Sequence, residues 1–247
     1  MVMKPQPAFW LERPDLAACE IAALVGYSLV VLDMEHGTIG TEAADAIVAH
    51  CRAIRLTTYV RVAAADRLLI QQALDYGADG VVLPQIRDVA HATEACAYAK
   101  YPPLGTRGVG YSRTMNYGAY DGIDDAFFAV ENARTVCHPM IETPGALRDV
   151  EAILALDTVD GVFIGPSDLS MTRGRGAFKF TAADQQDFRT VAAAARKANK
   201  VLGLPTPGAQ AYALAVAEGA HYVTVCDDLT ALRLGFAQGL QVAKDKP

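Results

Sequence analysis

Hydrophobic and polar positions divide the chain into two kinds of segment. Short, nearly all-apolar runs rich in β-branched residues predict buried strands, and longer Ala- and Leu-rich stretches with helical spacing predict helices. The predicted strands are residues 8–11, 28–33, 58–62, 80–84, 135–141, 161–165, 201–205 and 222–226. The predicted helices are residues 14–25, 41–53, 66–76, 87–99, 144–155, 182–198, 207–218 and 228–240.

Apolar strands that alternate with helices in this way predict an α/β protein with a closed parallel sheet, the (β/α)8 or TIM barrel. An open doubly wound sheet gives a similar alternation, so the pattern favours the barrel without excluding the other fold. The length of 247 residues is normal for one such barrel and does not require a second domain. We therefore expect residues 1–247 to form a single barrel domain.

One segment interrupts the alternation. Residues 101–122 read YPPLGTRGVGYSRTMNYGAYDG and are rich in Gly, Pro, Tyr and Arg. This stretch is too long for a plain connection, which predicts a functional loop or a subunit contact. Its GTRGVG piece does not join a strand directly to a helix, so we do not interpret it as a phosphate-binding loop.

Composition narrows the class of protein. Hydrophobic residues make up 52% of the chain and the net charge is −6, with no cluster of Lys and Arg. This argues against nucleic acid or an anionic membrane surface as a partner. The apolar runs are too short to span a membrane, the N-terminal residues lack the apolar core of a signal peptide, and the five cysteines are scattered. We expect a cytoplasmic protein with reduced thiols.

Polar groups gather where the predicted strands end. In a parallel barrel the chemistry takes place at the carboxyl ends of the strands, so an enzyme should concentrate titratable residues there. The residues found at or near these ends are Asp33, Glu35, His36, Arg61, Glu142, Asp168, Asp227 and Asp228.

Glu142 and Asp168 follow strands that are adjacent in sequence. Neighbouring strands lie about 4.8 Å apart, so both carboxylates can reach one cation. A small set of oxygen ligands that leaves positions open for water or substrate suits Mg²⁺ or Mn²⁺ better than Zn²⁺. The alternative is that Glu142 caps the next helix and Asp168 caps a short turn. Spacing alone does not separate these two interpretations.

Arg61 and His36 are the other two residues of interest. A guanidinium in the apolar strand TTYVRV needs an anionic partner, which is either a structural carboxylate or a substrate group with developing negative charge. His36 is the one histidine that follows a strand within the polar cluster, and a neutral imidazole there suits a general base. We expect Glu35, between Asp33 and His36, to point away and pair structurally.

At this point the motifs resemble a known family. The stretches LDMEHG, YVRV, ALDYGADGVVLPQIRD, YPPLGTRGVG, MIETPGAL, VFIGPSDLS and GAHYVTVCDD are similar to those of the HpcH/HpaI family of metal-dependent (class II) pyruvate aldolases, which includes 4-hydroxy-2-oxoheptane-1,7-dioate aldolases. The resemblance covers about residues 8 to 240, and MIET together with GPSDLS is its most specific part.

The resemblance implies a reaction and an assembly. The reaction is the reversible C–C cleavage of 4-hydroxy-2-oxo acids to pyruvate, or hydroxypyruvate, and an aldehyde through a metal-bound enolate. The cofactor is Mg²⁺ or Mn²⁺, with Co²⁺ as a further candidate, and no organic cofactor is expected. The assembly is a homohexamer, a trimer of dimers whose chains exchange their C-terminal helices.

The resemblance also implies roles for individual residues. Glu142 and Asp168 hold the metal, and His36 is the base. Arg61 stabilises the charge on the pyruvate oxygen, and Asp75 in ALDYG raises the basicity of His36. The remaining implied residues are Asp33, which steadies water near the metal, and the substrate-binding Gly165, Pro166, Ser167 and Asp168.

Met140 departs from the family pattern. Family members commonly carry Gln two residues before the metal-binding Glu, and that Gln contacts the substrate. Methionine cannot donate this hydrogen bond. We therefore expect an altered or wider pocket around Met140, suited to a substituted donor such as hydroxypyruvate. For the acceptor aldehyde, the loop residues Tyr111, Arg113 and Tyr117 are candidates.

Three other functions are consistent with parts of the sequence. A Schiff-base aldolase needs a lysine in a barrel strand, but none of the lysines falls in a predicted strand: Lys4, Lys100, Lys179, Lys197, Lys200, Lys244 and Lys246. A CoA-thioester lyase of the citrate-lyase β type would need basic residues near the pocket, for which Arg107 and Arg113 are candidates. A non-catalytic oligomeric, metabolite-binding barrel would require every polar strand-end residue to be structural.

Overall fold

The computed structural model describes residues 4–119 and 123–244, and within them the strands form one closed parallel barrel. Each strand pairs with the next along the chain, and β8 pairs with β1 to close the barrel. The strands are β1 (Gln6–Leu11), β2 (Leu29–Asp33), β3 (Thr57–Arg61), β4 (Gly80–Leu83), β5 (Val136–Ile141), β6 (Gly161–Ile164), β7 (Val201–Pro205) and β8 (Tyr222–Asp227). The predicted α/β barrel is therefore confirmed, and the doubly wound alternative is excluded.

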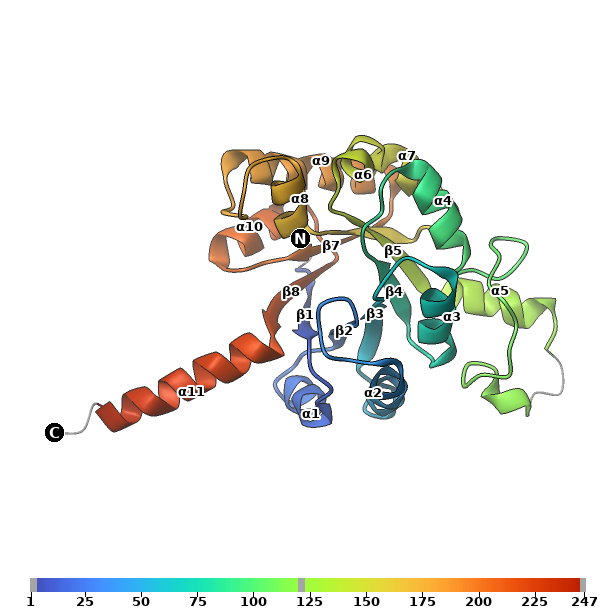
Figure 1. The fold of residues 1–247 in the computed structure, drawn as a ribbon, viewed down its shortest axis with the longest axis horizontal. Coiled ribbons are helices and arrows are strands. Elements are labelled where there is room, and N and C mark those ends of the chain that lie inside the picture. The colour runs from blue at the N-terminus through green and yellow to red at the C-terminus, as the bar shows by residue number, and fades with distance from the viewer. Residues whose placement is uncertain (1–3, 120–122, 245–247) are drawn as a thin grey trace.

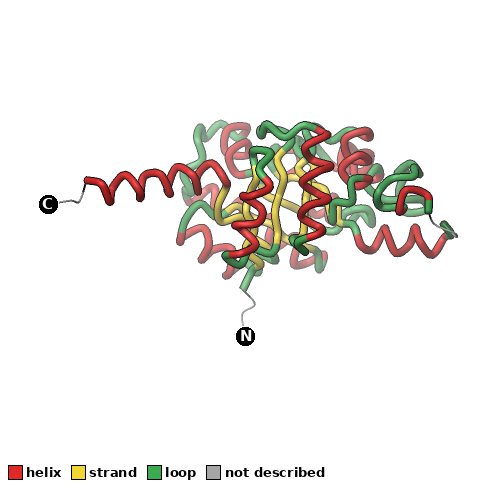
Figure 2. Tube along the Cα trace, turned by 90° about the horizontal axis from the view of Figure 1, so that it is seen from below, coloured by secondary structure: helices red, strands yellow, loops and turns green. Residues whose placement is uncertain are grey.

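Helices surround the barrel, and a short 3₁₀ turn lies in the loop before α5 (Figures 1 and 2). They are α1 (Leu16–Leu24), α2 (Thr41–Ala53), α3 (Arg67–Asp75), α4 (Val89–Ala97), η1 (Asn116–Gly118), α5 (Asp125–Arg134), α6 (Pro144–Arg148), α7 (Val150–Leu154), α8 (Pro166–Thr172), α9 (Ala182–Ala198), α10 (Ala209–Ala217) and α11 (Asp228–Lys244). Within the described ranges, none of them combines the length and the apolar composition needed to cross a membrane.

The helices differ from the sequence prediction at three places. Helices α5 and α8 were not predicted, and the single helix expected over 144–155 is divided at Asp149 into α6 and α7. The buried side chain of α5 is a polar one, Glu131, while Phe127 and Phe128 are only partly buried, so its apolar pattern is weak. Helix α8 begins at Pro166, directly after β6, because proline is well accommodated at the first helical position.

The barrel has two apolar layers. One lies between strands and helices, and a smaller one fills the barrel interior around Val31, Val82, Phe163 and Tyr222. His138 is also fully buried there, where its Nδ1 lies 3.1 Å from the hydroxyl oxygen of Tyr222. These side chains fill the barrel below its carboxyl-terminal rim.

Strand register brings the polar ends of β2 and β3 together. Asp33 and Arg61 are direct Cα partners across these strands. The same parallel arrangement places the ends of β5 and β6 side by side, with Ile141 paired to Ile164. The residues that follow these two strands, Glu142 and Gly165, therefore lie at one edge of the rim.

The C-terminal helix α11 projects from the barrel (Figure 1). It begins at the end of β8 and extends away from the other helices (Figures 1 and 2). Large apolar side chains along it are exposed to solvent, including Leu234, Phe236 and Leu240. An apolar helix of this kind has more hydrophobic surface in water than a folded chain usually leaves uncovered.

Candidate active site

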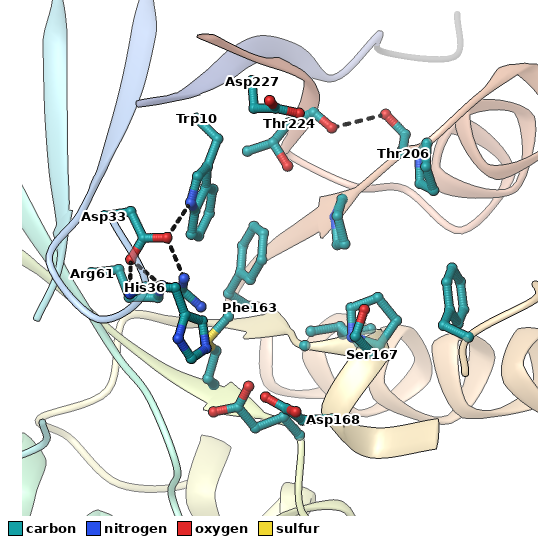
Figure 3. Close-up of a pocket in the computed structure, with 18 of the residues that line it drawn as sticks. Trp10, Asp33, His36, Arg61, Phe163, Ser167, Asp168, Thr206, Thr224 and Asp227 are labelled. Carbon is teal, nitrogen blue, oxygen red and sulfur yellow. Dashed lines mark hydrogen bonds and ion pairs between the residues drawn. The ribbon is translucent and has the colours of Figure 1, made fainter. Parts of the chain in front are cut away.

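A cavity of about 610 Å³ opens at the carboxyl ends of the strands. Figure 3 shows side chains from several strands pointing into it. Most of the residues proposed from the sequence line this cavity: Asp33, His36, Arg61, Met140, Glu142, Gly165, Pro166, Ser167 and Asp168. Its volume lies within the range of about 300–1,000 Å³ that is usual for small-molecule sites.

Asp33 and Arg61 form a buried ion pair at one side of the cavity. Arg61 Nε donates to Asp33 Oδ1 over 2.9 Å, and Arg61 Nη2 donates to Asp33 Oδ2. Asp33 also accepts hydrogen bonds from Trp10 Nε1 at 2.9 Å and from the backbone N–H of His36 at 3.1 Å. Burial raises the pKa of Asp33, but the hydrogen bonds and the charge of Arg61, together with the other donors, outweigh it and hold this pKa below its usual value.

Asp33 is thus an anchor for Arg61 and for the turn that carries His36. Its side chain is only 1% exposed, and its oxygens are occupied by these donors. Arg61 thus belongs to a structural ion pair, one of the two interpretations of this residue, and the carboxylate comes from the neighbouring strand β2. The guanidinium also lies 4.9 Å from the centre of the Trp10 ring, which fixes its plane.

Glu35 does not point away from the site as we expected. Its Oε2 lies 3.1 Å from Arg61 Nη1 and 4.0 Å from His36 Nε2. The turn after β2 breaks the strict alternation of an extended chain, so adjacent side chains need not face opposite sides here. Glu35 does pair structurally, as predicted, but within the polar cluster of the rim.

His36 is the most accessible of these groups. Its side chain is 65% exposed, and Figure 3 shows its ring pointing into the cavity, on the side of Asp168. The backbone hydrogen bond to Asp33 holds the turn that presents it. An imidazole in this position can exchange protons with a bound ligand and with solvent.

Glu142 and Asp168 lie together on the opposite side of the cavity from Trp10. Glu142 is 1% exposed, and its Oε1 accepts a hydrogen bond of 2.5 Å from the backbone N–H of Gln85. Burial raises the pKa of Glu142 to about 7, and the nearby carboxylates of Glu35 and Asp168 add to this effect. Asp168 Oδ2 accepts a bond of 3.4 Å from the side-chain amide of Gln85.

The capping alternative for these two carboxylates does not match the structure. Thr143, not Glu142, caps α6, because its hydroxyl accepts from the backbone N–H of Ala146. Asp168 lies within the first turn of α8, where no side chain caps the helix. Neither carboxylate therefore has a capping bond that would explain its position.

The residues present fit a divalent cation. Glu142 and Asp168 place two carboxyl groups side by side in a partly buried position where the described residues provide no lysine or arginine ion pair to either of them. In the described ranges no three His, Cys, Asp or Glu side chains converge as a closed metal site. Two carboxylates with open positions suit Mg²⁺ or Mn²⁺, which keep water or substrate ligands.

Gly165 is required by close packing at this edge. A Cβ on Gly165 would lie 2.4 Å from Glu142 Oε2 and 2.7 Å from Glu142 Cβ, so any larger residue would displace the carboxylate. The chain then turns into α8 through Pro166 and Ser167, which line the cavity. Met140 is 3% exposed and also lines the cavity, next to Phe163 on β6.

Among the residues assigned a catalytic, metal-binding or donor-binding role, Asp75 is the one that does not line the cavity. It ends α3 at the opposite end of the barrel and forms an ion pair of 2.6 Å with Arg107. A helix that starts after the carboxyl end of β3 must run back to the start of β4, so its last residue cannot reach the rim of its own barrel. An effect of Asp75 on His36 within one chain is therefore not supported.

The loop residues proposed for the acceptor are also distant from the cavity. Tyr111 and Tyr117 are exposed on the outer surface, and Arg113 forms an ion pair of 2.6 Å with Asp45. Arg107 is buried against the Tyr101 ring. Residues 120–122 of this segment lie outside the described residues.

Sequence reasoning missed several residues that line or support the cavity. Gln85 donates hydrogen bonds to both Glu142 and Asp168. Its backbone has a positive φ of 54°, which the residue type at this position does not predict. Trp10 orients Asp33, and its position at the end of the first predicted strand was a usable signal. The other missed lining residues are Glu12, Phe163, Ile164, Phe178, Pro205, Thr206, Pro207, Thr224, Val225, Cys226 and Thr230.

Comparisons with known proteins agree on one family. The family model described as HpcH/HpaI aldolase/citrate lyase matches residues 6–233. A 4-hydroxy-2-oxovalerate aldolase from Novosphingobium aromaticivorans is 38% identical over 184 residues, which cover 72% of this chain and 67% of that protein. A hydroxypyruvate/pyruvate aldolase from Rhizorhabdus wittichii is 29% identical over 248 residues, which cover 98% and 95%. The crystal structure of an HpcH/HpaI aldolase from Desulfitobacterium hafniense has a TM-score of 0.89 at 28% identity, covering 99% and 94%.

Proposed function

The chain belongs to the HpcH/HpaI aldolase/citrate lyase family, and we propose that it splits 4-hydroxy-2-oxo acids into pyruvate or hydroxypyruvate and an aldehyde. It is an aldolase of a metal-dependent family. The observation that supports the proposal most is the arrangement of Glu142, Asp168, His36 and Arg61 around one cavity. We propose Mg²⁺ or Mn²⁺ as its metal, with Co²⁺ as a further candidate.

A divalent cation held by Glu142 and Asp168 would supply positive charge that stabilises negative charge developing on the 2-oxo group. In cleavage, His36 takes the proton from the C4 hydroxyl. The C3–C4 bond breaks, its electron pair moves to C3 and the carbonyl oxygen of the oxo acid, and the aldehyde leaves. A proton returned to C3 completes pyruvate, and aldol addition follows the same steps in reverse.

Arg61 is suited to bind the substrate while it remains paired. A guanidinium has five N–H groups, of which Asp33 takes two and Glu35 faces one. The remaining donors are available to a substrate oxygen. Because Asp33 and Trp10 fix the guanidinium plane, these donors are oriented before substrate arrives.

Exchange of the pyruvate methyl protons in D₂O tests this proposal without an acceptor aldehyde. We expect exchange, followed by NMR, when Mg²⁺ or Mn²⁺ is present, and loss of exchange in EDTA and in the His36→Ala variant. Hydroxypyruvate serves as the second donor. If neither donor exchanges with metal present, the proposal of an aldolase acting on these donors is wrong.

The alternative functions receive less support from the geometry. None of the lysines within the described ranges lies on a strand, and Lys246 lies outside them, so a Schiff-base mechanism has no candidate at the rim. Arg107 and Arg113, the candidates for binding CoA phosphates, are engaged with Asp75 and Asp45 away from the cavity. A non-catalytic barrel would not explain why Glu142 and Asp168 lie side by side without a basic side chain paired to either of them.

The position of Met140 at the cavity wall leads to a prediction about which donor the protein prefers. A Met140→Gln variant introduces an amide at the cavity wall that can donate a hydrogen bond to the donor substrate. We expect its ratio of kcat/KM for pyruvate to that for hydroxypyruvate to rise by roughly tenfold, the value of about 1.4 kcal/mol that one hydrogen bond contributes. Steady-state kinetics with one fixed acceptor measures this ratio, and an unchanged ratio would show that Met140 does not select the donor.

The position of α11 supports an oligomer. Its apolar side chains, including Phe236, are exposed in a single chain, and the helix extends away from the barrel (Figure 1). We propose that a second copy covers this helix and provides its own in exchange, and that three such dimers form the hexamer implied by the resemblance. Sedimentation velocity tests this assembly, which a monomeric chain would contradict.

A further inference from the structure

The side of the cavity away from Glu142 and Asp168 has its own composition. We call it the acceptor wall and define it as Glu12, Thr206, Thr224, Asp227 and Thr230, all of which line the cavity. Figure 3 shows Asp227, Thr224 and Thr206 opposite Asp168. The donor acid would lie near Glu142 and Asp168, so the acceptor wall faces the part of the substrate that leaves as the aldehyde.

Two carboxylates in the acceptor wall have oxygens that accept no hydrogen bond from the described residues. Asp227 Oδ1 accepts from the backbone N–H of Thr230 over 2.7 Å, which leaves Oδ2 without such a bond among the described residues. The Glu12 side chain forms no hydrogen bond or ion pair with any described residue, although its backbone groups bond to Asp228 and Thr38. Both carboxylates can therefore accept hydrogen bonds from a ligand.

The acceptor wall also lacks a positive charge. Among the described residues lining the cavity, Arg61 is the one side chain with a permanent positive charge, and it is paired with Asp33 and Glu35. Arg13 is next to Glu12 in the chain, but it is exposed and does not line the cavity. A second carboxylate on the substrate would thus meet Glu12 and Asp227, and the one permanent cation of the cavity, Arg61, already shares its charge with Asp33 and Glu35.

These charges discriminate between classes of aldehyde. An aldehyde with a distal carboxylate would place like charges together in a partly desolvated cavity, which disfavours binding. An aldehyde with hydroxyl groups would donate to the carboxylates, and hydrogen bonds to charged acceptors are stronger than neutral ones. An unsubstituted alkyl aldehyde would neither be repelled nor form these bonds.

We propose that the acceptor is an uncharged, hydroxylated aldehyde and that Glu12 and Asp227 select it. The 2-oxo acid that is cleaved then carries a polyhydroxylated tail and a single carboxylate, and is not a dicarboxylic acid. This inference rests on the proposed aldolase function and adds the substrate class to it.

Aldol addition with three acceptors tests the inference. With pyruvate or hydroxypyruvate as the donor and Mg²⁺ or Mn²⁺ present, kcat/KM is measured for glyceraldehyde, propanal and succinic semialdehyde. We expect glyceraldehyde to exceed propanal by roughly tenfold and succinic semialdehyde by roughly a hundredfold, as one charge-assisted hydrogen bond and one unbalanced charge would produce. Glyceraldehyde and propanal have the same chain length, so their comparison isolates the hydroxyl groups.

Variants assign the preference to residues. Glu12→Gln removes one negative charge, and we expect it to raise the ratio of kcat/KM for succinic semialdehyde to that for glyceraldehyde by roughly tenfold. Asp227→Asn should act in the same direction, since Asn still accepts from the Thr230 N–H. Glu94→Gln is the matched control, because Glu94 is exposed on α4 outside the cavity and should leave the ratio at the wild-type value.

The outcomes separate this inference from the function on which it rests. If the pyruvate protons exchange with metal but succinic semialdehyde is used as well as glyceraldehyde, the inference is wrong and the aldolase function stands. If the preference holds but both variants keep the wild-type ratio, the assignment to Glu12 and Asp227 is wrong. If neither donor exchanges its protons, the function fails and the inference with it.

Discussion

Replacing Glu142 with Gln is expected to lower the rate of pyruvate proton exchange by roughly a thousandfold or more. The substitution keeps the shape of the side chain and an oxygen that can accept the Gln85 N–H, so the local fold should remain. It removes one of the two carboxylates available to hold a divalent cation. Loss of the cation costs several kcal/mol of stabilisation of the negative charge that develops in the reaction. Because about 1.4 kcal/mol corresponds to a factor of ten in rate, this loss amounts to roughly a thousandfold. NMR of pyruvate in D₂O with saturating Mn²⁺ measures the rate.

The stability of the metal-free protein provides an independent check on the same variant. Glu142 ionises near its ordinary pKa of 4.5 in the unfolded chain, whereas burial keeps it protonated up to about pH 7 in the folded protein. Between these values the unfolded state binds fewer protons, so the free energy of unfolding of the wild type falls as pH rises.

The Glu142→Gln variant has no ionisable group at this position, so its free energy of unfolding should not fall in this way as pH rises. We expect it to be more stable than the wild type in EDTA at pH 8 and equal to it below pH 4.5, as measured by urea denaturation. Metal should then stabilise the wild type but not the variant. Exchange that persists in the variant at the wild-type rate would rule out Glu142 as a ligand, and Glu94→Gln serves as the control for the loss of a carboxylate elsewhere.

The barrel could be predicted from the sequence because its signal is local. Each strand is a short apolar run that is buried on both faces, and each run falls where the structure has a strand. The rule that chemistry lies at the carboxyl ends of the strands then placed Asp33, Arg61, Glu142 and Asp168 at one rim. Helix α5 was not predicted because the side chain that it buries, Glu131, is polar, whereas its apolar side chains are partly or fully exposed.

The remaining parts of the site depend on contacts between distant segments. The role of Gln85 arises from a backbone N–H that meets Glu142, 57 positions later in the chain, and a backbone donor has no residue type to reveal it. Arg61 required an anionic partner, but only the register of β2 against β3 identifies that partner as Asp33. Asp75 was assigned by motif, and the direction of α3 places it at the other end of the barrel.

Arg61→Ala is expected to damage both activity and folding. The guanidinium is buried between Asp33, Glu35 and Trp10, and its removal leaves the Asp33 carboxylate, which is 1% exposed, without its charged partner. Breaking a buried ion pair on one side costs about 3–5 kcal/mol of stability. Arg61→Lys keeps the charge but not the two-pronged bond to Asp33, so it should be intermediate in stability.

The double variant Arg61→Ala/Asp33→Asn separates the structural role from the catalytic one. Asparagine removes the unpaired charge, and its one side-chain oxygen can still accept from the backbone N–H of His36, but its NH2 group then faces Trp10 Nε1. Part of the lost stability should therefore return in urea denaturation. The rate of pyruvate proton exchange should not return, because no donor then faces the substrate oxygen. If exchange recovered together with stability, Arg61 would act only by holding the rim in place, and the oxygen charge would have to be stabilised by other groups of the cavity.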